Sequence, residues 1–186
     1  MSDRQQAAVI RLVRELLLSL PNLARAGWGN RGVPLSLNES VAAHSFGVAM
    51  LAIFLAVFEK ANPERASLLA NLHDILEAET GDLTPRVTSL LEELGISKDQ
   101  LEAQAEERRE QNLPRPLRDL LREASREFNE GRTLEARVAR DADILQRGIQ
   151  GVQYAAQGFD TSEIVDRTRE LLTTETAIAL WNQIFQ

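Results

Sequence analysis

The sequence of 186 residues predicts an all-α fold, and three observations support this prediction. Apolar residues recur three and four positions apart, which is the period of a helix, and no segment alternates with the two-residue period of a strand. Residues that begin and end helices stand between the apolar stretches. Hydrophobic residues make up 44% of the chain, enough for one continuous core, so we expect a single domain over residues 1–186.

Each expected helix is bounded by residues that start or stop helices. Asn, Ser or Thr caps the start, proline fits the first turn, and glycine closes the end. These signals predict helices that cover, in chain order, residues 3–20, 38–60, 62–80, 84–94, 97–111, 115–129, 133–157 and 161–185, the last with a break near residue 173. The boundary residues are, in the same order, Pro21, Asn38 or Ser40, Asn62 with Pro63 and Gly81, Thr84 with Pro85 and Gly95, Ser97 with Gln100, Pro114 with Gly131, Thr133 with Gly158, and Thr161.

The helical spacing also predicts which faces are buried. The first helix is expected to bury an apolar stripe formed by Val9, Leu12, Val13, Leu16, Leu17 and Leu20. The glycine-rich residues 22–37 are expected to form a loop, and the charged run 102–110 is expected to be a solvated helix face. The C-terminal residues 161–186 are expected to pack on the rest of the domain, with Trp181 and Phe185 in a packing or dimer contact.

The composition limits the partners and the location of the protein. A formal charge of −7 makes duplex nucleic acid an unfavourable partner, because both carry negative charge. The chain has no cysteine, so any metal must be held by imidazole and carboxylate groups. The longest apolar run, Val48 to Phe58, is too short to cross a bilayer, and the polar start is unlike a signal peptide. We therefore expect a cytoplasmic protein that binds neither duplex nucleic acid nor a membrane.

One of the two histidines lies in a dense group of acidic residues. Residues three and four apart share a helix face, so His73, Asp74 and Glu77 can point into one cleft. Asp82 follows Gly81 just beyond the expected helix end, where a turn can direct its carboxylate toward the same cleft. Four groups that can bind a metal or transfer a proton therefore fall within ten residues.

Two further groups can reach this cleft from other helices. His44 lies in the first turns of the second expected helix, which is joined to the third by only a few residues, so the two helices can pack antiparallel. Asp143 lies on a largely apolar face, where a carboxylate needs a partner that a divalent metal would supply. Asp141 is a rival for this position, but it lies about 200° away on the helix, so only one of the two can face the cleft.

Four segments of the chain resemble, in order, the motifs of one enzyme family. They are Arg25-Ala26-Gly27-Trp28, Glu39-Ser40-Val41-Ala42-Ala43-His44-Ser45, His73-Asp74-Ile75-Leu76-Glu77-Ala78-Glu79-Thr80-Gly81-Asp82 and Ala142-Asp143-Ile144-Leu145. In these segments the chain resembles the HD-domain metal-dependent phosphohydrolases, in particular the branch of 5′-deoxynucleotidases and oxetanocin-like proteins. The resemblance covers residues 12–158. It departs from that branch at Ala43, where glutamate is common, and near Gly47, where a basic residue is common.

The resemblance implies a metal-dependent hydrolase with an HD-domain helical bundle and its metal site between helices. The implied metal ligands are His44, His73, Asp74 and Asp143. Glu77 is implied to handle the proton of the attacking water, and Asp82 to lie beside the scissile phosphate or a second metal. A divalent metal suits this chemistry because it lowers the pKa of bound water and polarises a phosphoryl oxygen. Manganese, cobalt, iron, nickel, zinc and magnesium all fit such a ligand set.

The resemblance also implies a substrate and an assembly. Arg25 and Trp28 match positions that contact the phosphate and the deoxyribose in this branch. The expected reaction is therefore the release of phosphate from small nucleotides, namely deoxyribonucleoside 5′-monophosphates. A homodimer is expected, because symmetric dimers are the commonest assembly and members of this branch often dimerise.

Two other functions stay open on the sequence alone. The same centre could hydrolyse another phosphoester, such as a nucleoside triphosphate or a cyclic nucleotide. Alternatively, the chain could be a non-catalytic metal-binding helical module that interacts with other proteins. The intact ligand set and Glu77 argue against the second alternative, and an assay over a panel of nucleotides separates the first from the expected reaction.

Overall fold

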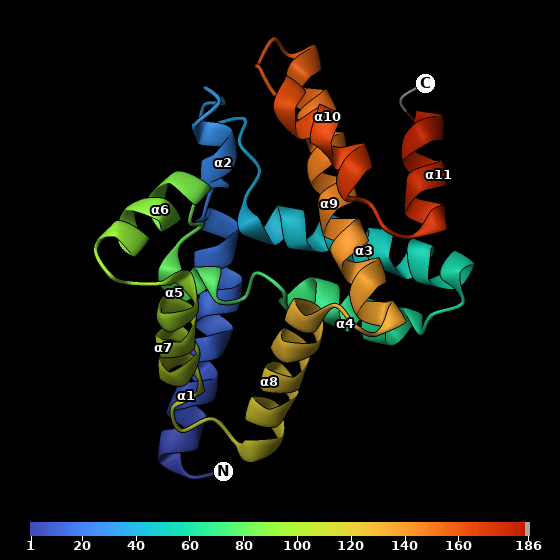
Figure 1. Ribbon diagram of the computed structural model, residues 1–186. Coiled ribbons are helices and arrows are strands. Elements are labelled where there is room, and N and C mark those ends of the chain that lie inside the picture. Colours follow the sequence, from blue (N-terminus) through green and yellow to red (C-terminus); the bar gives the residue numbers. More distant parts are fainter. Residues whose placement is uncertain (185–186) are drawn as a thin grey trace.

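The fold is a bundle of helices joined by turns (Figure 1). The structure is a computed structural model, and it describes residues 1–184. Its α-helices are α1 Asp3–Arg14, α2 Ala26–Gly29, α3 Val41–Glu59, α4 Pro63–Leu72, α5 Glu77–Thr80, α6 Pro85–Glu93, α7 Lys98–Glu110, α8 Arg115–Glu130, α9 Leu134–Ala156, α10 Ser162–Leu171 and α11 Glu175–Ile184. Within residues 1–184 there is no strand, only an isolated bridge between Ala24 and Ser40, so the all-α prediction is confirmed.

The core lies where α3, α4 and α9 pack together, and α11 closes one end of it. Many of its buried residues are small, which lets the helix backbones lie close together. They include Ala49, Ala52, Ala56, Ala66, Ala70, Ala136, Ala139 and Ala142, with Val48, Leu55, Leu69, Val138 and Leu145 filling the space between the helices. At Gly148 an added Cβ would lie 2.6 Å from Thr168 and 2.7 Å from Trp181, so only glycine fits where α9 meets α10 and α11.

The predicted helix starts are confirmed by the side chains that cap them. Ser40 rather than Asn38 caps α3, since its side chain accepts a hydrogen bond from the backbone N–H of Ala43. Similar caps are formed by Asn62 for α4, Thr84 for α6, Ser97 with Gln100 for α7 and Thr133 for α9. These bonds satisfy N–H groups that have no partner within the helix, and they fix where each helix begins.

α3 is long and apolar enough to cross a membrane, because it extends beyond the apolar run noted in the sequence. Yet 44% of its apolar stretch is buried in the structure, and the helix packs against both α4 and α9. Core helices of soluble proteins are apolar for the same reason. The place of α3 in the core therefore explains the apolar residues on its buried side, while Phe46, Phe54 and Phe58 on its other side are exposed.

The third expected helix is shorter than predicted. It ends at Leu72, and residues 73–76 form a tight turn before the single turn of α5. In that turn the N–H of Ile75 bonds to the carbonyl of Leu72, and the N–H of Glu77 bonds to the carbonyl of Asp74. The imidazole of His73 also reaches back to the carbonyl of Ala70 at 2.6 Å, which satisfies one of the carbonyls left free at a helix end. The turn is thus stabilised by bonds that the apolar pattern does not reveal.

The first helix also differs from the prediction, since α1 passes into a π-helix over Glu15–Ser19 and a 3-10 turn over Leu20–Asn22. A π-helix has a wider turn than an α-helix, so the buried face predicted with the α-helical period no longer matches the face that is buried there. Leu12 and Leu20 are buried as expected, but Leu17 is 67% exposed and Val13 is 45% exposed. The buried side of α1 is centred on Ala8 and Leu12 instead.

The charged run 102–110 is not wholly solvated, because Arg109 and Glu110 are only 1% and 3% exposed. Two contacts with other helices hold this end of α7. Arg11 of α1 donates to the backbone carbonyls of Arg108 and Arg109 at 2.7 and 2.8 Å, and Glu110 accepts from Arg122 of α8. Glu110 is buried with a partner from another helix, which helical periodicity cannot indicate, whereas the guanidinium of Arg109 lies 3.6 Å from Glu106 and 3.7 Å from Glu110 of its own helix.

The expected loop over residues 22–37 contains α2, a single helical turn. The N–H of Ala26 donates to Asp82 at 2.6 Å, so a carboxylate distant in sequence caps this turn. At the other end of the chain, the predicted break near residue 173 is confirmed between α10 and α11. Trp181 packs into the core at 7% exposure, whereas Phe185 lies outside the described residues.

Candidate metal centre

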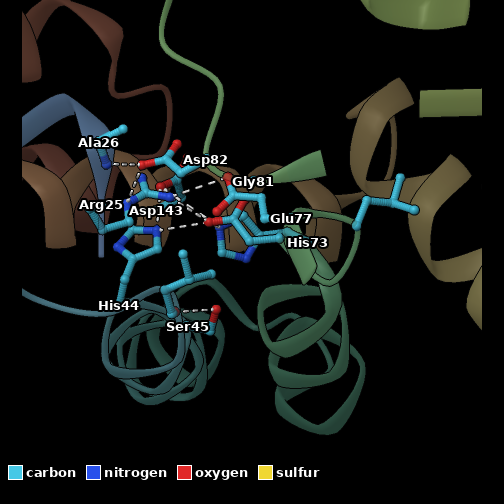
Figure 2. Close-up of polar contacts among 12 residues, drawn as sticks. Arg25, Ala26, His44, Ser45, His73, Glu77, Gly81, Asp82 and Asp143 are labelled. Atoms are coloured by element: carbon cyan, nitrogen blue, oxygen red, sulfur yellow. Dashed lines mark hydrogen bonds and ion pairs between the residues drawn. The ribbon is translucent and has the colours of Figure 1, made fainter. Parts of the chain in front are cut away.

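Side chains from five parts of the chain converge at one place beside the core, as Figure 2 shows for His44, His73, Glu77, Asp82 and Asp143. His44 comes from α3 and Asp143 from α9, the two long helices that cross in the core. His73 and Asp74 come from the turn that follows α4, Glu77 from α5, and Asp82 from the residues after Gly81. The structure therefore brings together the six predicted metal-binding and catalytic side chains.

The two imidazoles are buried and aimed at a common point. His44 is fully buried, the side chain of His73 is 4% exposed, and their ring centroids lie 5.3 Å apart. Each Nδ1 has a hydrogen-bond partner at 2.6 Å, Gln146 for His44 and the carbonyl of Ala70 for His73. Each Nε2, in contrast, is buried without a hydrogen-bond partner. Two unpartnered nitrogen atoms facing the same place are the arrangement that two metal ligands require.

Two carboxylates complete this group. The Oδ2 atom of Asp74 lies 3.2 Å from the Nε2 of His73 and 3.6 Å from the Nε2 of His44. The Oδ1 atom of Asp143 lies 3.2 Å from the Nε2 of His44 and 3.9 Å from the Nε2 of His73. Ligand atoms of His44, His73 and Asp74 lie within 4.8 Å of one another, close enough to share one ion.

The choice between Asp141 and Asp143 follows from what each carboxylate contacts. Asp143 faces the imidazoles, while Asp141 points to the start of α11 and accepts hydrogen bonds from the backbone and hydroxyl groups of Thr173 and Thr174. Asp141 thus connects α9 to the last helix. Only Asp143 is available to the candidate centre.

Arg25 lies among the carboxylates. The Nη1 atom of Arg25 is 2.8 Å from Asp74 and 3.5 Å from Glu77, and its Nε is 3.9 Å from Asp82. Burial alone would lower the pKa of Arg25, but the charges of Asp74, Asp82 and Glu77 outweigh it and raise this pKa. The predicted phosphate-binding arginine is therefore positioned at the centre as a fixed positive charge.

The pKa values show an excess of negative charge at this point. Burial alone would lower the pKa of His73, but Asp74 and Asp143 raise it to about 9. Burial raises the pKa of Glu77 to about 8, with the charge of Asp74 adding to the effect. The carboxyl groups of Asp74 and Asp143 have lowered pKa values despite their burial, because the imidazoles lie beside them. Such a site stabilises additional positive charge.

These observations fit a divalent cation. Two imidazole nitrogens without a partner and two ionised carboxylates form a set of nitrogen and oxygen ligands, and no thiolate is available in a chain without cysteine. A divalent ion would satisfy the buried Nε2 atoms and offset the excess negative charge. Borderline and hard divalent metals are the ions that such ligands hold.

Trp28 occupies a different environment from the other predicted site residues. It is 3% exposed and packs edge-on against Tyr154, with ring centroids 5.1 Å apart. Its indole N–H donates to Glu39 at 2.9 Å. The contact with a sugar that the sequence suggested for Trp28 stays a prediction.

Gln146 is a site residue that the sequence analysis missed. It lies three positions after Asp143 on α9, so the two share a helix face. That spacing was the signal that could have identified it. Its amide contacts both His44 and Glu39, which places it directly behind one of the imidazoles.

A sequence model of the HD domain family matches residues 19–180. The chain belongs to this family. Among curated relatives, the mouse protein named 5′-deoxynucleotidase HDDC2 is 30% identical over 95% of this chain and 92% of its own length. The 5′-deoxynucleotidase of Vibrio cholerae is 39% identical over 44% of this chain and 45% of its own length, so this match covers less than half of each protein.

Solved structures show the same HD fold. A protein of Pyrococcus horikoshii superposes with a TM-score of 0.72 and 29% identity, covering 94% of both chains. A structure from Magnetospirillum magnetotacticum, titled a predicted metal-dependent phosphohydrolase, has a TM-score of 0.68 over 98% of this chain, but only 20% identity. The second likeness bears on the fold alone.

Proposed function

We propose that this HD-domain protein is a metal-dependent 5′-nucleotidase that releases phosphate from deoxyribonucleoside 5′-monophosphates. The observation that carries the proposal is the pair of buried Nε2 atoms, on His44 and His73, that face Asp74 and Asp143 without a hydrogen-bond partner. The relatives named 5′-deoxynucleotidase supply the substrate class.

In this proposal His44, His73, Asp74 and Asp143 hold one divalent ion. When bound, the ion would lower the pKa of water and polarise a phosphoryl oxygen. The ligands come from α3, from the turn after α4 and from α9, and the core packing of these helices fixes their separation. Ligands fixed in this way need little rearrangement on binding.

Glu77 is the proposed proton acceptor. Its Oε2 atom is buried without a hydrogen-bond partner, so it can take the proton from water as the water oxygen attacks phosphorus. The bond between phosphorus and the 5′ oxygen breaks, and the same proton can pass to that leaving oxygen. Asp82 is proposed to lie beside the scissile phosphate, although it also caps α2 through Ala26.

Arg25 is the proposed phosphate ligand. Its planar guanidinium can donate two parallel hydrogen bonds to a phosphate, and the adjacent carboxylates keep it charged. It lies immediately before α2, the turn that also contains Trp28. A nucleotide bound by Arg25 would therefore have its sugar near α2. The proposed contact of Trp28 with the deoxyribose requires the indole, which is 3% exposed, to be uncovered when the nucleotide binds.

The test combines elemental analysis with a phosphate-release screen over deoxyribonucleotides and ribonucleotides. His73→Ala and Asp74→Ala are expected to lose both the bound metal and phosphate release, while the exposed Glu79→Ala keeps both. Full metal-dependent activity in either of the first two variants would contradict the ligand assignment. If phosphate were released only from nucleoside triphosphates or cyclic nucleotides, the proposed substrate would be wrong and one of these would take its place. If the protein bound metal but released phosphate from no nucleotide, it would be a non-catalytic module.

We also propose a homodimer that forms through the outer face of α3. This face carries a stripe of exposed apolar side chains, Phe46, Met50, Phe54, Val57 and Phe58. The three phenylalanines are 67%, 54% and 73% exposed, and at 150–250 Å² per aromatic side chain they present roughly 300–500 Å² of apolar surface. That is about half of the ~800 Å² that each partner of a standard interface buries. A second copy presents the same uncharged stripe and needs no complementary charge.

Light scattering on the purified protein tests the dimer. Phe54→Glu places a charge in the middle of the stripe and is expected to give a monomer, while Leu94→Glu at another exposed position leaves the dimer intact. A monomeric wild-type protein at tens of micromolar would contradict the dimer, and binding to lipid vesicles would assign the stripe to a membrane instead.

We also propose the domain extent and the cellular location of the protein. We infer one HD-type domain over residues 1–186, because the family match at residues 19–180 includes α2 to α10 and part of α11. α1 lies before the match, but its Ala8 and Leu12 pack with Ile75, Leu113 and Leu121 of the matched region. A cytoplasmic location with no duplex nucleic acid partner is supported by the absence of cysteine and the net charge of −7. Fractionation of cells and a DNA-binding assay at low salt test these two points.

A further inference from the structure

Behind His44 lies a chain of three polar side chains, Gln146, Glu39 and Trp28, and the proposed reaction gives no role to the first two. We propose that these residues form a relay that sets the tautomer and the direction of His44, and that Gln146 is a positioning residue for metal affinity. The inference rests on the proposed metal centre, because it assigns a role to groups behind one of its ligands.

The hydrogen bonds of the relay have only one consistent direction. The Oε1 atom of Gln146 lies 2.6 Å from the Nδ1 of His44, and its Nε2 donates to Glu39 at 2.9 Å. The other carboxylate oxygen of Glu39 accepts from the indole N–H of Trp28, also at 2.9 Å. Since an ionised carboxylate can only accept, the amide nitrogen of Gln146 must face Glu39 and its oxygen must face His44.

The direction of the relay determines the tautomer of His44. An amide oxygen only accepts, so Nδ1 of His44 must carry the proton and donate it. In the neutral ring the proton is then absent from Nε2, the buried nitrogen that faces Asp143 at 3.2 Å. Without Gln146, Asp143 would favour the opposite tautomer, in which Nε2 holds the proton and cannot bind a metal.

The relay is held in place by packing as well as by hydrogen bonds. The backbone N–H of Glu39 donates to the hydroxyl of Tyr154, which in turn donates to the carbonyl of Leu37. Trp28 packs edge-on against the ring of Tyr154. One carboxylate oxygen of Glu39 and its backbone N–H are therefore fixed by a buried aromatic cluster that also contains Val33, and the other oxygen is left to Gln146.

Gly47 provides the space that Gln146 occupies. It lies three residues after His44 on α3, and a Cβ at this position would be 3.1 Å from the Cγ of Gln146. That distance is tighter than ordinary van der Waals contact, so a larger residue at 47 would displace the amide from His44. α3 thus supplies both the imidazole of His44 and, at Gly47, the space through which Gln146 reaches that imidazole.

The relay is tested by NMR of ¹⁵N-histidine, because the chain has only two histidines and each gives its own signals. Wild-type protein is expected to show His44 with its proton on Nδ1, both without metal and with Zn²⁺. Gln146→Leu is expected to lose this tautomer in the metal-free protein and to bind Zn²⁺ about 10- to 100-fold more weakly. Gln153→Leu, at an exposed position of the same helix, is the matched control and should behave as wild type.

A reciprocal exchange separates positioning from general stability. Gln146→Glu alone places two carboxylates against each other and is expected to weaken Zn²⁺ binding. Combined with Glu39→Gln, it restores every donor and acceptor. The new carboxylate at position 146 would accept from His44 and from the new amide at position 39, whose oxygen accepts from Trp28. The double variant is therefore expected to regain most of the lost affinity.

Two results would overturn the relay. One is a folded Gln146→Leu protein whose His44 tautomer and Zn²⁺ affinity equal those of wild type. The other is a double variant no better than Gln146→Glu alone, which would show that Gln146 acts only through stability. If the wild-type protein bound no metal, the proposed function would fail, while the tautomer of the metal-free protein would still decide the relay.

Discussion

The candidate centre is built from two regions of different character. One consists of α3 and α9, regular helices of 19 and 23 residues, and each contributes one side chain, His44 or Asp143. The other is the segment of residues 73–82, in which a helix end, a turn and the single turn of α5 follow one another and four chemical groups are supplied. The long helices give precise placement, whereas the irregular segment gives a high density of functional groups.

The difference arises from how each region is held. α3 and α9 are locked by burial along one side, so a ligand on either helix has little freedom. Segment 73–82 is anchored mainly by Ile75, which packs with Leu12, Leu113 and Leu121 of a separate cluster. The polar groups of this segment reach the centre because the helix ends at Leu72 and the backbone turns over residues 73–76. Changes in the two regions should therefore have different consequences.

The largest effect is expected in the irregular segment, at Glu77. Glu77→Gln removes the proposed proton acceptor but no metal ligand, so phosphate release should fall by about 10²- to 10⁴-fold with unchanged metal content. Steady-state rates and elemental analysis measure the two quantities. Glu79→Gln, on the same short helix but exposed, serves as the control. A Glu77→Gln rate above one tenth of wild type would remove Glu77 from this role.

The packed region should respond in stability instead. Leu145 of α9 is completely buried in the core, so Leu145→Ala should lower the free energy of unfolding by about 2–5 kcal/mol. Urea denaturation measures this change. Leu90→Ala, at a position that is 52% exposed, should change the free energy by no more than about 0.5 kcal/mol. Equal effects of the two substitutions would mean that α9 is not the rigid element inferred here.

Gly81 tests the irregular segment without altering a polar side chain. Its φ of 74° and ψ of 166° lie in a region that side chains disfavour, so Gly81→Ala should cost about 1–3 kcal/mol and also slow phosphate release by shifting Asp82. A Cβ there meets no atom within 4 Å, so the cost would be backbone strain alone. Gly27→Ala also has open space but an ordinary φ, and it should not destabilise the protein. A Gly81→Ala protein as stable and active as Gly27→Ala would show that this turn is unstrained.

The smallest effect concerns the ion pair of Arg65 with Glu127, which connects α4 to α8 at the base of the segment. Burial alone raises the pKa of Glu127, but hydrogen bonds from Thr133 and Arg65 outweigh it and lower this pKa below 4.5. A lowered pKa means that the pair stabilises the fold above pH 4.5 and that this contribution is lost as the pH falls through the lowered value. The pair is partly exposed, so the contribution should be below about 1 kcal/mol.

Urea midpoints of wild type and Glu127→Gln at pH 7 and pH 3 check this expectation. The difference between the two proteins should be larger at pH 7 than at pH 3, because protonation of Glu127 removes its charge at low pH. A difference that grows toward low pH would reverse the sign of the proposed pKa shift.

Local signals in the sequence were sufficient for most of the helices. Ser40, Thr84 and Thr133 cap helices where expected, since a cap needs only its own side chain and the next few backbone groups. The candidate centre was predicted for a similar reason, because the spacing of its acidic residues and histidines can be read directly from the sequence.

Features that depend on distant partners were not predictable. The turn of α2 capped by Asp82 and the burial of Glu110 against Arg122 require contacts between different parts of the chain. The same holds for the contact of Gln146 with His44, which joins α9 to α3 across the core. The break after Leu72 rests on local bonds of His73, Ile75 and Glu77, but the apolar pattern does not reveal them.

The sequence by itself thus determined the helical class and most helix boundaries, because each is encoded by residues within a few positions of one another. It also named the groups that could bind a metal, because His44, the segment 73–82 and Asp143 each stand in a short motif. The motif resemblance favoured Asp143 over Asp141, but only the tertiary structure shows that Asp143 faces the imidazoles and that both unpartnered Nε2 atoms meet at one point. The physical reason is that the rotation of a helix about its own axis is fixed by packing against its neighbours, and that packing exists only in the folded chain.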